Sequence, residues 1–185
     1  QRDVFRNISV AGVAKKAGRD IVLIHSETIH PVERAVLSEN ILTCPFEIQY
    51  CGWMQDIYPW LQARLHTPFW RLYWNLKPGG IIRSAAGEMH LTCGNFVLIP
   101  ASYEFSTEAD VSFDQFYIHF NFVDTVKAVG DRIYTIPGDR FSKDYIAEFV
   151  ASFRKLENRL RCEMIAHVVL GHALLKCQDG PLIRE

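Results

Sequence analysis

Short strand-like segments separated by turn signals constrain the fold of this chain more than any other feature of its sequence. Between residues 46 and 137 such segments recur at short intervals, and turn sequences such as Pro78-Gly79-Gly80 and Gly130-Asp131 separate them. The segments are Phe46–Tyr50, Trp70–Leu76, Gly80–Ser84, Glu88–Cys93, Phe96–Ile99, Phe113–Phe122 and Arg132–Ile136. Parallel strands need long crossover connections and antiparallel strands do not, so this spacing predicts an antiparallel barrel or sandwich.

The first 45 residues form an N-terminal extension with weaker signals. Apolar residues spaced between Val10 and Ala17, followed by Gly18, predict a short helix. This helix resembles the first helix of a helix-turn-helix. The next segment, Ile21 to Ile24, is apolar and β-branched, and it predicts a strand instead of an exposed recognition helix. We therefore do not expect this extension to read DNA.

Residues 138 to 185 predict a helical hairpin. Ser142 is a suitable N-cap for the first helix, and Gly180-Pro181 ends the second. The second helix has apolar residues around much of its circumference: Met164, Ile165, Val168, Val169, Leu170, Ala173, Leu174 and Leu175. These residues cannot all face one wall of a β-domain. We therefore expect the helices to mediate a homodimer, unless residues 1 to 45 fold back over the second helix.

Composition and charge narrow the class of protein. Of the 185 residues, 49% are apolar and 22% are charged, which is typical of a soluble globular domain. The formal net charge of -1 gives the chain no electrostatic footprint for nucleic acid. Its apolar runs are too short to cross a bilayer, so we expect no membrane partner. Five cysteines without a C-x-x-C pair favour the reducing cytoplasm over a disulfide framework.

Residues 94 to 109 match part of a known motif. In the cupin superfamily the second motif is G-x5-P-x-G-x2-H-x3-N, and Gly94 and Pro100 supply its first glycine and its proline at the right spacing. Phe105 stands at the histidine position and Ala109 at the asparagine position, and the first motif, H-x-H followed by glutamate, does not occur. A catalytic metal needs about three converging protein ligands. We therefore expect a cupin-like jelly roll without a metal or another cofactor.

A wider set of short motifs carries a more specific resemblance. The motifs are Trp70 through Asn75, Gly79-Gly80, Gly94 through Pro100, Phe105-Ser106-Thr107 and Gln115 through Phe120. In order and spacing they resemble the N-terminal effector-sensing cupin domain of AraC-type bacterial transcription regulators, over about residues 50 to 178. The resemblance implies a cytoplasmic sensor with a small-molecule effector, which dimerises through its helices. It also implies that DNA is bound only by a helix-turn-helix domain absent from residues 1 to 185.

Two of the expected strands have one polar face, which suggests a binding site. Because side chains alternate along a strand, Arg71, Tyr73 and Asn75 share a face, as do Gln115, Tyr117, His119 and Asn121. These faces are either solvated or line a pocket for a small polyhydroxylated molecule such as a sugar. The residues that we predict to bind the ligand are Arg71, Tyr73, His90, Gln115, Tyr117 and His119.

Two other functions stay open on the sequence. A cupin enzyme that needs no metal, such as a sugar isomerase, is compatible with the missing metal ligands. A cupin-shaped interaction module without any ligand is the third possibility. We therefore predict three parts: an extension over residues 1 to 45, a cupin-like sensing domain over 46 to 137, and a dimerisation segment over 138 to 185.

Overall fold

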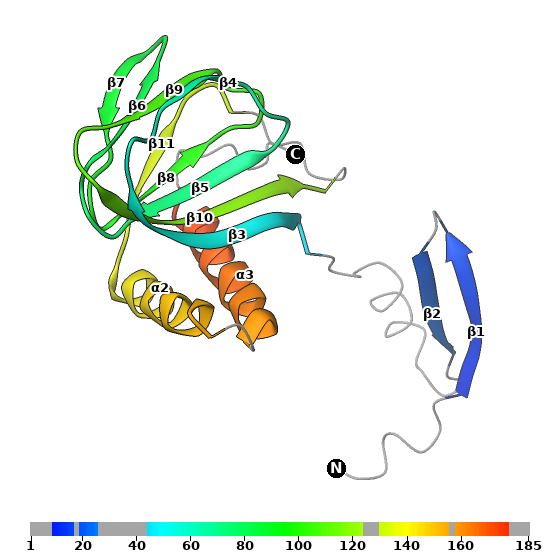
Figure 1. Ribbon diagram of the computed structural model, residues 1–185. Helices are drawn as coiled ribbons and strands as arrows, with labels where there is room; N and C mark the ends of the chain where they lie inside the picture. The colour runs from blue at the N-terminus through cyan, green and yellow to red at the C-terminus, as the bar shows by residue number, and fades with distance from the viewer. Residues whose placement is uncertain (1–8, 17–18, 26–43, 124–129, 156–157, 178–185) are drawn as a thin grey trace. The chain divides into compact units, whose positions relative to one another are not determined.

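The computed structural model describes residues 9–16, 19–25, 44–123, 130–155 and 158–177, with the backbone alone described before residue 44 (Figure 1). The chain divides into two compact units, residues 1–43 and 44–185. In the first unit, β1 (Ser9–Lys16) pairs antiparallel with β2 (Arg19–His25). The predicted strand at residues 21 to 24 is confirmed, but the predicted helix at 10 to 17 is wrong. A short apolar run fits the period of a helix and that of a strand equally well, and here the pairing with β2 stabilises the strand.

The second unit contains two antiparallel sheets (Figure 1). The five-stranded sheet has the order β11-β8-β5-β10-β3, and the four-stranded sheet has the order β4-β9-β6-β7. The strands are β3 (Phe46–Ile57), β4 (Gln62–Leu65), β5 (Trp70–Asn75), β6 (Gly80–Ser84), β7 (Gly87–His90), β8 (Asn95–Ile99), β9 (Phe105–Ala109), β10 (Phe113–Phe122) and β11 (Tyr134–Pro137). The predicted antiparallel β-class is confirmed, as a sandwich of two sheets and not as a closed barrel.

Two of these strands lack a clear signal in the sequence. The β4 segment, Gln-Ala-Arg-Leu, consists of good helix formers, and the β9 segment mixes the strand formers phenylalanine and threonine with serine, glutamate and alanine. Both become strands through pairing, since β9 pairs with β4 on one side and with β6 on the other. The strand conformation of β4 is therefore a consequence of tertiary contacts, and that of β9 depends on them in part.

The two helices are α2 (Arg140–Phe153) and α3 (Arg159–Lys176), and both follow the last strand. The N-cap of α2 is Asp139, whose carboxylate accepts a hydrogen bond from the Ser142 N–H at 2.9 Å. The prediction of Ser142 as the cap is wrong, because Ser142 is the residue that the cap binds. The predicted stop of the second helix at Gly180-Pro181 lies outside the described residues.

The helices cover one face of the five-stranded sheet (Figure 1). From the sheet, the contact contains Trp70, Leu72, Trp74, Phe96, Leu98, Phe116, Ile118 and Phe120, and from the helices Ile146, Phe149, Ile165, Val169, Leu170 and Leu174. At its centre the rings of Phe116 and Phe149 meet edge to face, with centroids 4.8 Å apart. The apolar faces that the alternation on β5 and β10 predicts are thus packed in a core.

A second core lies on the opposite face of this sheet. It contains Trp60, Tyr73, Ile82, Leu91, Val97, Ile99, Phe105 and Phe113, which come from both sheets and from the loops between their strands. The polar face of β5 and β10 is therefore the inner face of the sandwich. In the described part of the chain, no helix is both long and apolar enough to cross a membrane.

Candidate functional site

Three cross-strand pairs of polar side chains lie on the inner face of β5 and β10. The register places Arg71 opposite His119, Tyr73 opposite Tyr117, and Asn75 opposite Gln115. Arg71, Asn75 and Gln115 are only 4%, 2% and 1% exposed. The structure therefore brings together five of the residues that the sequence predicts to bind a ligand. The sequence was compatible with either a solvated face or a face inside a pocket. In the structure most of this polar face is enclosed.

The Asn75–Gln115 pair forms one end of this polar inner face. Gln115 Nε2 donates a hydrogen bond to Asn75 Oδ1 at 3.1 Å. The Asn75 amide nitrogen, which is buried, has no hydrogen-bond partner among the described residues. A buried donor without a partner is costly, so this amide group is available to an acceptor from outside the chain.

Arg71 lies at the other end, between aromatic rings. Its guanidinium carbon is 4.9 Å from the centroid of the Phe69 ring and 5.0 Å from that of Phe105, which belongs to the opposite sheet. Burial lowers the pKa of Arg71, and the Tyr73 hydroxyl, which hydrogen-bonds to it, raises it. Burial also raises the pKa of Tyr73 to about 12. At neutral pH the pair is therefore a cationic guanidinium beside a neutral phenol.

His119 is surrounded by rings. It stacks on Phe69 with the ring centroids 4.8 Å apart, and the Tyr117 ring is 5.2 Å away. Burial, followed by the positive charge of Arg71, lowers the pKa of His119 to about 4. The imidazole is therefore neutral at pH 7 and can accept or donate a hydrogen bond without carrying charge.

His90 is the one predicted residue that the structure does not bring to this cluster. It ends β7, and its side chain is 64% exposed and 2.9 Å from the carboxylate of Glu88. The alternation along β7 turns Met89 toward the inner core and His90 away from it.

Sequence reasoning also missed residues that shape the cluster. Phe69 precedes β5 and Phe105 stands at a motif position, and neither has a polar atom that would mark it as part of a site. Gly52 on β3 lies under the Tyr117 ring, since a Cβ at this position would be 2.7 Å from the Tyr117 hydroxyl oxygen. A side chain at Gly52 would therefore displace the Tyr117 ring from its present position.

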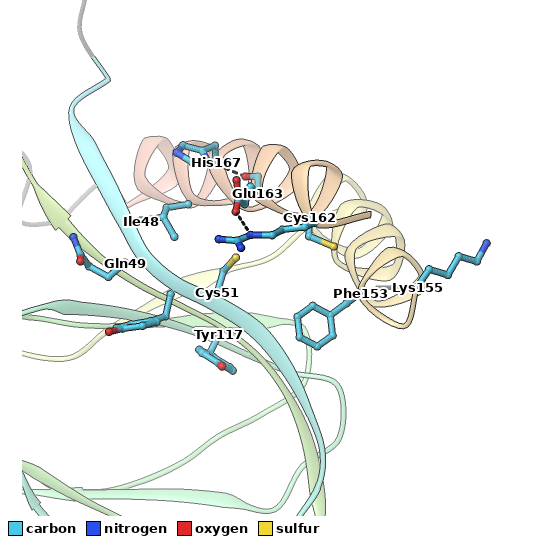
Figure 2. A pocket seen from close by; sticks show the side chains of 11 residues that line it. Ile48, Gln49, Cys51, Tyr117, Phe153, Lys155, Cys162, Glu163 and His167 are labelled. Carbon is cyan, nitrogen blue, oxygen red and sulfur yellow. Dashed lines mark hydrogen bonds and ion pairs between the residues drawn. The ribbon is translucent and has the colours of Figure 1, made fainter. Parts of the chain in front are cut away.

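A separate pocket of about 610 Å³ lies between β3 and the two helices (Figure 2). Its lining consists of Ile48, Gln49, Tyr50, Cys51, Tyr117, Phe153, Lys155, Arg159, Cys162, Glu163 and His167. In this pocket Arg159 forms an ion pair with Glu163 at 2.9 Å. Burial is the main cause that raises the pKa of Cys51 to about 11, and the neighbouring Cys162 thiol raises it further. Tyr117 is the residue common to this pocket and the predicted site.

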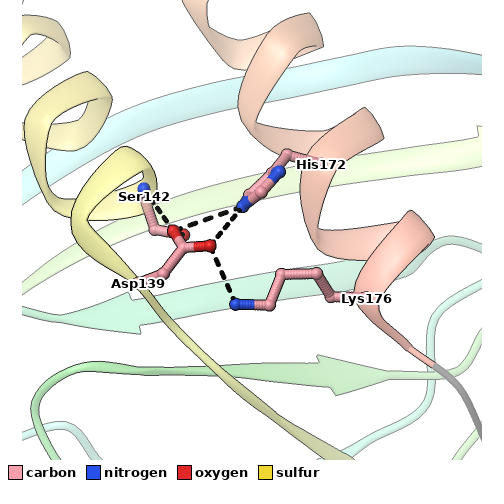
Figure 3. A network of polar contacts seen from close by, with 4 residues as sticks. All are labelled: Asp139, Ser142, His172 and Lys176. Carbon is pink, nitrogen blue, oxygen red and sulfur yellow. Dashed lines mark hydrogen bonds and ion pairs between the residues drawn. The ribbon is translucent and has the colours of Figure 1, made fainter.

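A polar network joins the two helices at the rim of the sheet (Figure 3). The Asp139 carboxylate accepts hydrogen bonds from Ser142 N and Oγ, each at 2.9 Å, and from Lys176 Nζ at 3.0 Å. His172 Nε2 lies 3.0 Å from the same carboxylate. The Ser142 N–H, followed by Lys176, holds the pKa of Asp139 well below its usual range. This network fixes the start of α2 to the end of α3.

The donor set of the described residues does not suggest a metal centre. Among these residues no three histidine, cysteine, aspartate or glutamate side chains are grouped closely enough to hold an ion. Phe105, at the cupin histidine position, is buried and contacts Arg71.

Comparisons with protein-family models and with curated protein sequences find no match. Solved structures give matches of low identity. ToxT from Vibrio cholerae, in a crystal structure with a bound unsaturated fatty acid, is 9% identical with a TM-score of 0.47, over 75% of this chain and 56% of that one. YhaK from Escherichia coli is 9% identical with a TM-score of 0.41, over 51% of this chain and 44% of that one. The chain thus aligns with about half the length of each of these proteins.

Proposed function

We propose that residues 44–185 form the effector-sensing domain of an AraC-type transcription regulator, and that a small polar organic molecule binds on the inner face of its sandwich. One observation carries the proposal: Arg71, Asn75 and Gln115 are buried on a face where a fold that needed only a core would place apolar residues. Burying such groups costs free energy unless they are fully paired. Their polarity is thus explained by a bound molecule.

The side chains of the site suit a small molecule with hydrogen-bonding groups. Arg71 and Asn75 supply donors, and His119 supplies a neutral ring that can take either role. Phe69 and Phe105 supply aromatic surface next to them. Small-molecule sites commonly combine apolar walls with a few polar groups that fix orientation. The regulator class comes from the sequence resemblance, in which DNA is bound by another domain.

The helices support the dimer that the sequence predicts. While Ile165, Val169 and Leu174 are buried against the sheet, Leu160 and Met164 are 70% and 62% exposed. Val168 and Leu175 are exposed as well, so the apolar residues of α3 that do not reach the sheet form a second stripe. Burying such stripes against each other in two copies would remove this apolar surface from water.

A metal-independent cupin enzyme, such as a sugar isomerase, is the second candidate. It is favoured by the neutral His119 next to Tyr73 and Tyr117, because these side chains could exchange a proton with a bound molecule. The two candidates differ in the fate of the ligand: a sensor releases it unchanged, and an enzyme converts it.

Binding by the full chain tests the proposal. Pentoses, hexoses and small organic acids are screened by thermal shift, and each hit is measured by calorimetry. We expect Gln115→Leu to weaken a hit about tenfold, because the Asn75 amide loses the hydrogen bond that orients it and leucine offers the ligand no polar group. The exposed matched control Gln62→Leu should bind like the wild type.

The recovered ligand separates the two candidates. After long incubation with the protein, NMR of the ligand should show no chemical change. Conversion of the ligand would favour the enzyme. A chain that binds no compound of the screen, or a Gln115→Leu variant that binds as tightly as the wild type, would contradict a binding site on this inner face.

A further inference from the structure

Arg71 has no partner of opposite charge among the described residues, although it is almost completely buried. Its contacts are the Phe69 and Phe105 rings and the Tyr73 hydroxyl. A buried ionic group normally has a counter-ion, because its transfer from water into the protein interior is strongly unfavourable. Rings and one hydroxyl offset only part of this cost.

The acidic side chains of the neighbouring strands are engaged elsewhere. Glu108 of β9 pairs with Arg83 at 3.1 Å, and Asp114 of β10 pairs with Lys77 at 3.1 Å. Glu88 of β7 pairs with both Arg83 and His90. These carboxylates therefore have cationic partners of their own.

The rest of the polar inner face adds donors and no negative charge. The Asn75 amide group has an unpaired N–H donor, while its oxygen is already bonded to Gln115. The side chains opposite Arg71 and Tyr73 are the neutral His119 and Tyr117. The inner face thus carries an excess positive charge and an excess of donors, and both require acceptors from a bound molecule.

We propose that the ligand of this face is a small organic acid, whose carboxylate pairs with the Arg71 guanidinium while its carbon skeleton packs against Phe69 and Phe105. This inference rests on the proposed function and specifies its ligand. The planar guanidinium can bind a carboxylate through two parallel hydrogen bonds, which a neutral sugar hydroxyl cannot reproduce. The surrounding rings exclude water, which strengthens this pairing.

The test compares acids with their neutral amides on the full chain. The probes are benzoate, phenylacetate, straight-chain acids from acetate to palmitate, and glucuronate, each beside its amide, with arabinose as the neutral polyol. Binding is measured by calorimetry and thermal shift. We expect at least one acid to bind, and its amide to bind at least about tenfold more weakly because the charged hydrogen bonds are lost.

Three arginine variants locate the carboxylate of the bound acid. Arg71→Met should abolish binding of the acid, while Arg83→Met, a matched change on the exposed side of β6, should leave it unchanged. Arg71→Lys keeps the positive charge but not the planar guanidinium that can form two parallel hydrogen bonds. This variant should bind the acid less tightly than the wild type. The NMR signal of the His119 ring should move when the acid binds, which places the acid beside Arg71.

The outcomes separate this inference from the proposed function. If arabinose or the amides bind as well as the acids, the ligand is not an acid, and the sensing function stands. If an acid binds equally to the wild type and to Arg71→Met, its carboxylate is elsewhere. Should Arg71→Met fail to fold, Arg71→Lys and the acid–amide comparison decide. If no probe of either class binds, both proposals are wrong.

Discussion

Replacing His119 by glutamine changes how the stability of this protein depends on pH. Burial and the charge of Arg71 hold the pKa of His119 at about 4 in the folded protein, against 6.5 for an exposed histidine side chain. Between these values the unfolded chain binds a proton that the folded chain does not. The stability due to the neutral imidazole is therefore fully present above about pH 6.5 and is lost as the pH falls to about 4.

The size of the effect follows from the two pKa values. At about 1.4 kcal/mol for each unit of difference between the two pKa values, full protonation of His119 lowers the free energy of unfolding by about 3 kcal/mol. Between about pH 7 and pH 4.5, linkage gives a loss of about 2 kcal/mol from this one residue. Other acid-sensitive groups add to the loss, but they are the same in the wild type and in a His119 variant.

Urea unfolding at these two pH values measures the effect. The wild type should lose about 2 kcal/mol more than His119→Gln between about pH 7 and pH 4.5. The control is His66→Gln, whose side chain is exposed and which should follow the wild type. Parallel losses in wild type and His119→Gln, or an NMR titration of His119 with a midpoint near 6.5, would refute the reasoning about its burial beside Arg71.

Three further variants test the packing and the assembly. Phe149→Ala should cost about 3–5 kcal/mol in urea unfolding, because the ring is fully buried against Phe116, and a cost below about 1 kcal/mol would contradict this contact. Asp139→Ala should lower Tm more than Asp144→Ala, which removes only an exposed ion pair, and equal Tm values would contradict a structural role of Asp139. In sedimentation experiments Met164→Glu should convert a dimer to a monomer, and a dimer that persists would move the interface away from α3.

The alternation of residues predicted the part of the fold that matters most for the site. On β5 and β10 it separated an apolar face, now packed under the helices, from a polar face inside the sandwich. Alternation alone could not show that the polar face is enclosed, because burial depends on where the second sheet lies. That sheet includes β4, whose residues favour a helix, and β9, in which only Phe105 and Thr107 favour a strand.

Local signals also fail where a distant partner decides the structure. The segment from Val10 to Ala17 fits a helix by spacing, and pairing with β2 makes it a strand. Phe69 and Phe105 join the site because β5 and β9 face each other across the sandwich, which no local pattern in the sequence indicates. His90 shares the residue type of a ligand-binding group, but the register of β7 turns it outward.

The Asp139 carboxylate also has a mechanical consequence. It stands two residues after β11 and holds the first turn of α2 and the last turn of α3 at once. The preceding residue, Gly138, is fixed as well, because its N–H donates to the Gly94 carbonyl at 3.0 Å. Because one carboxylate holds both helix ends, a displacement of β11 within the sheet would be passed to the start of α2 and the end of α3 together.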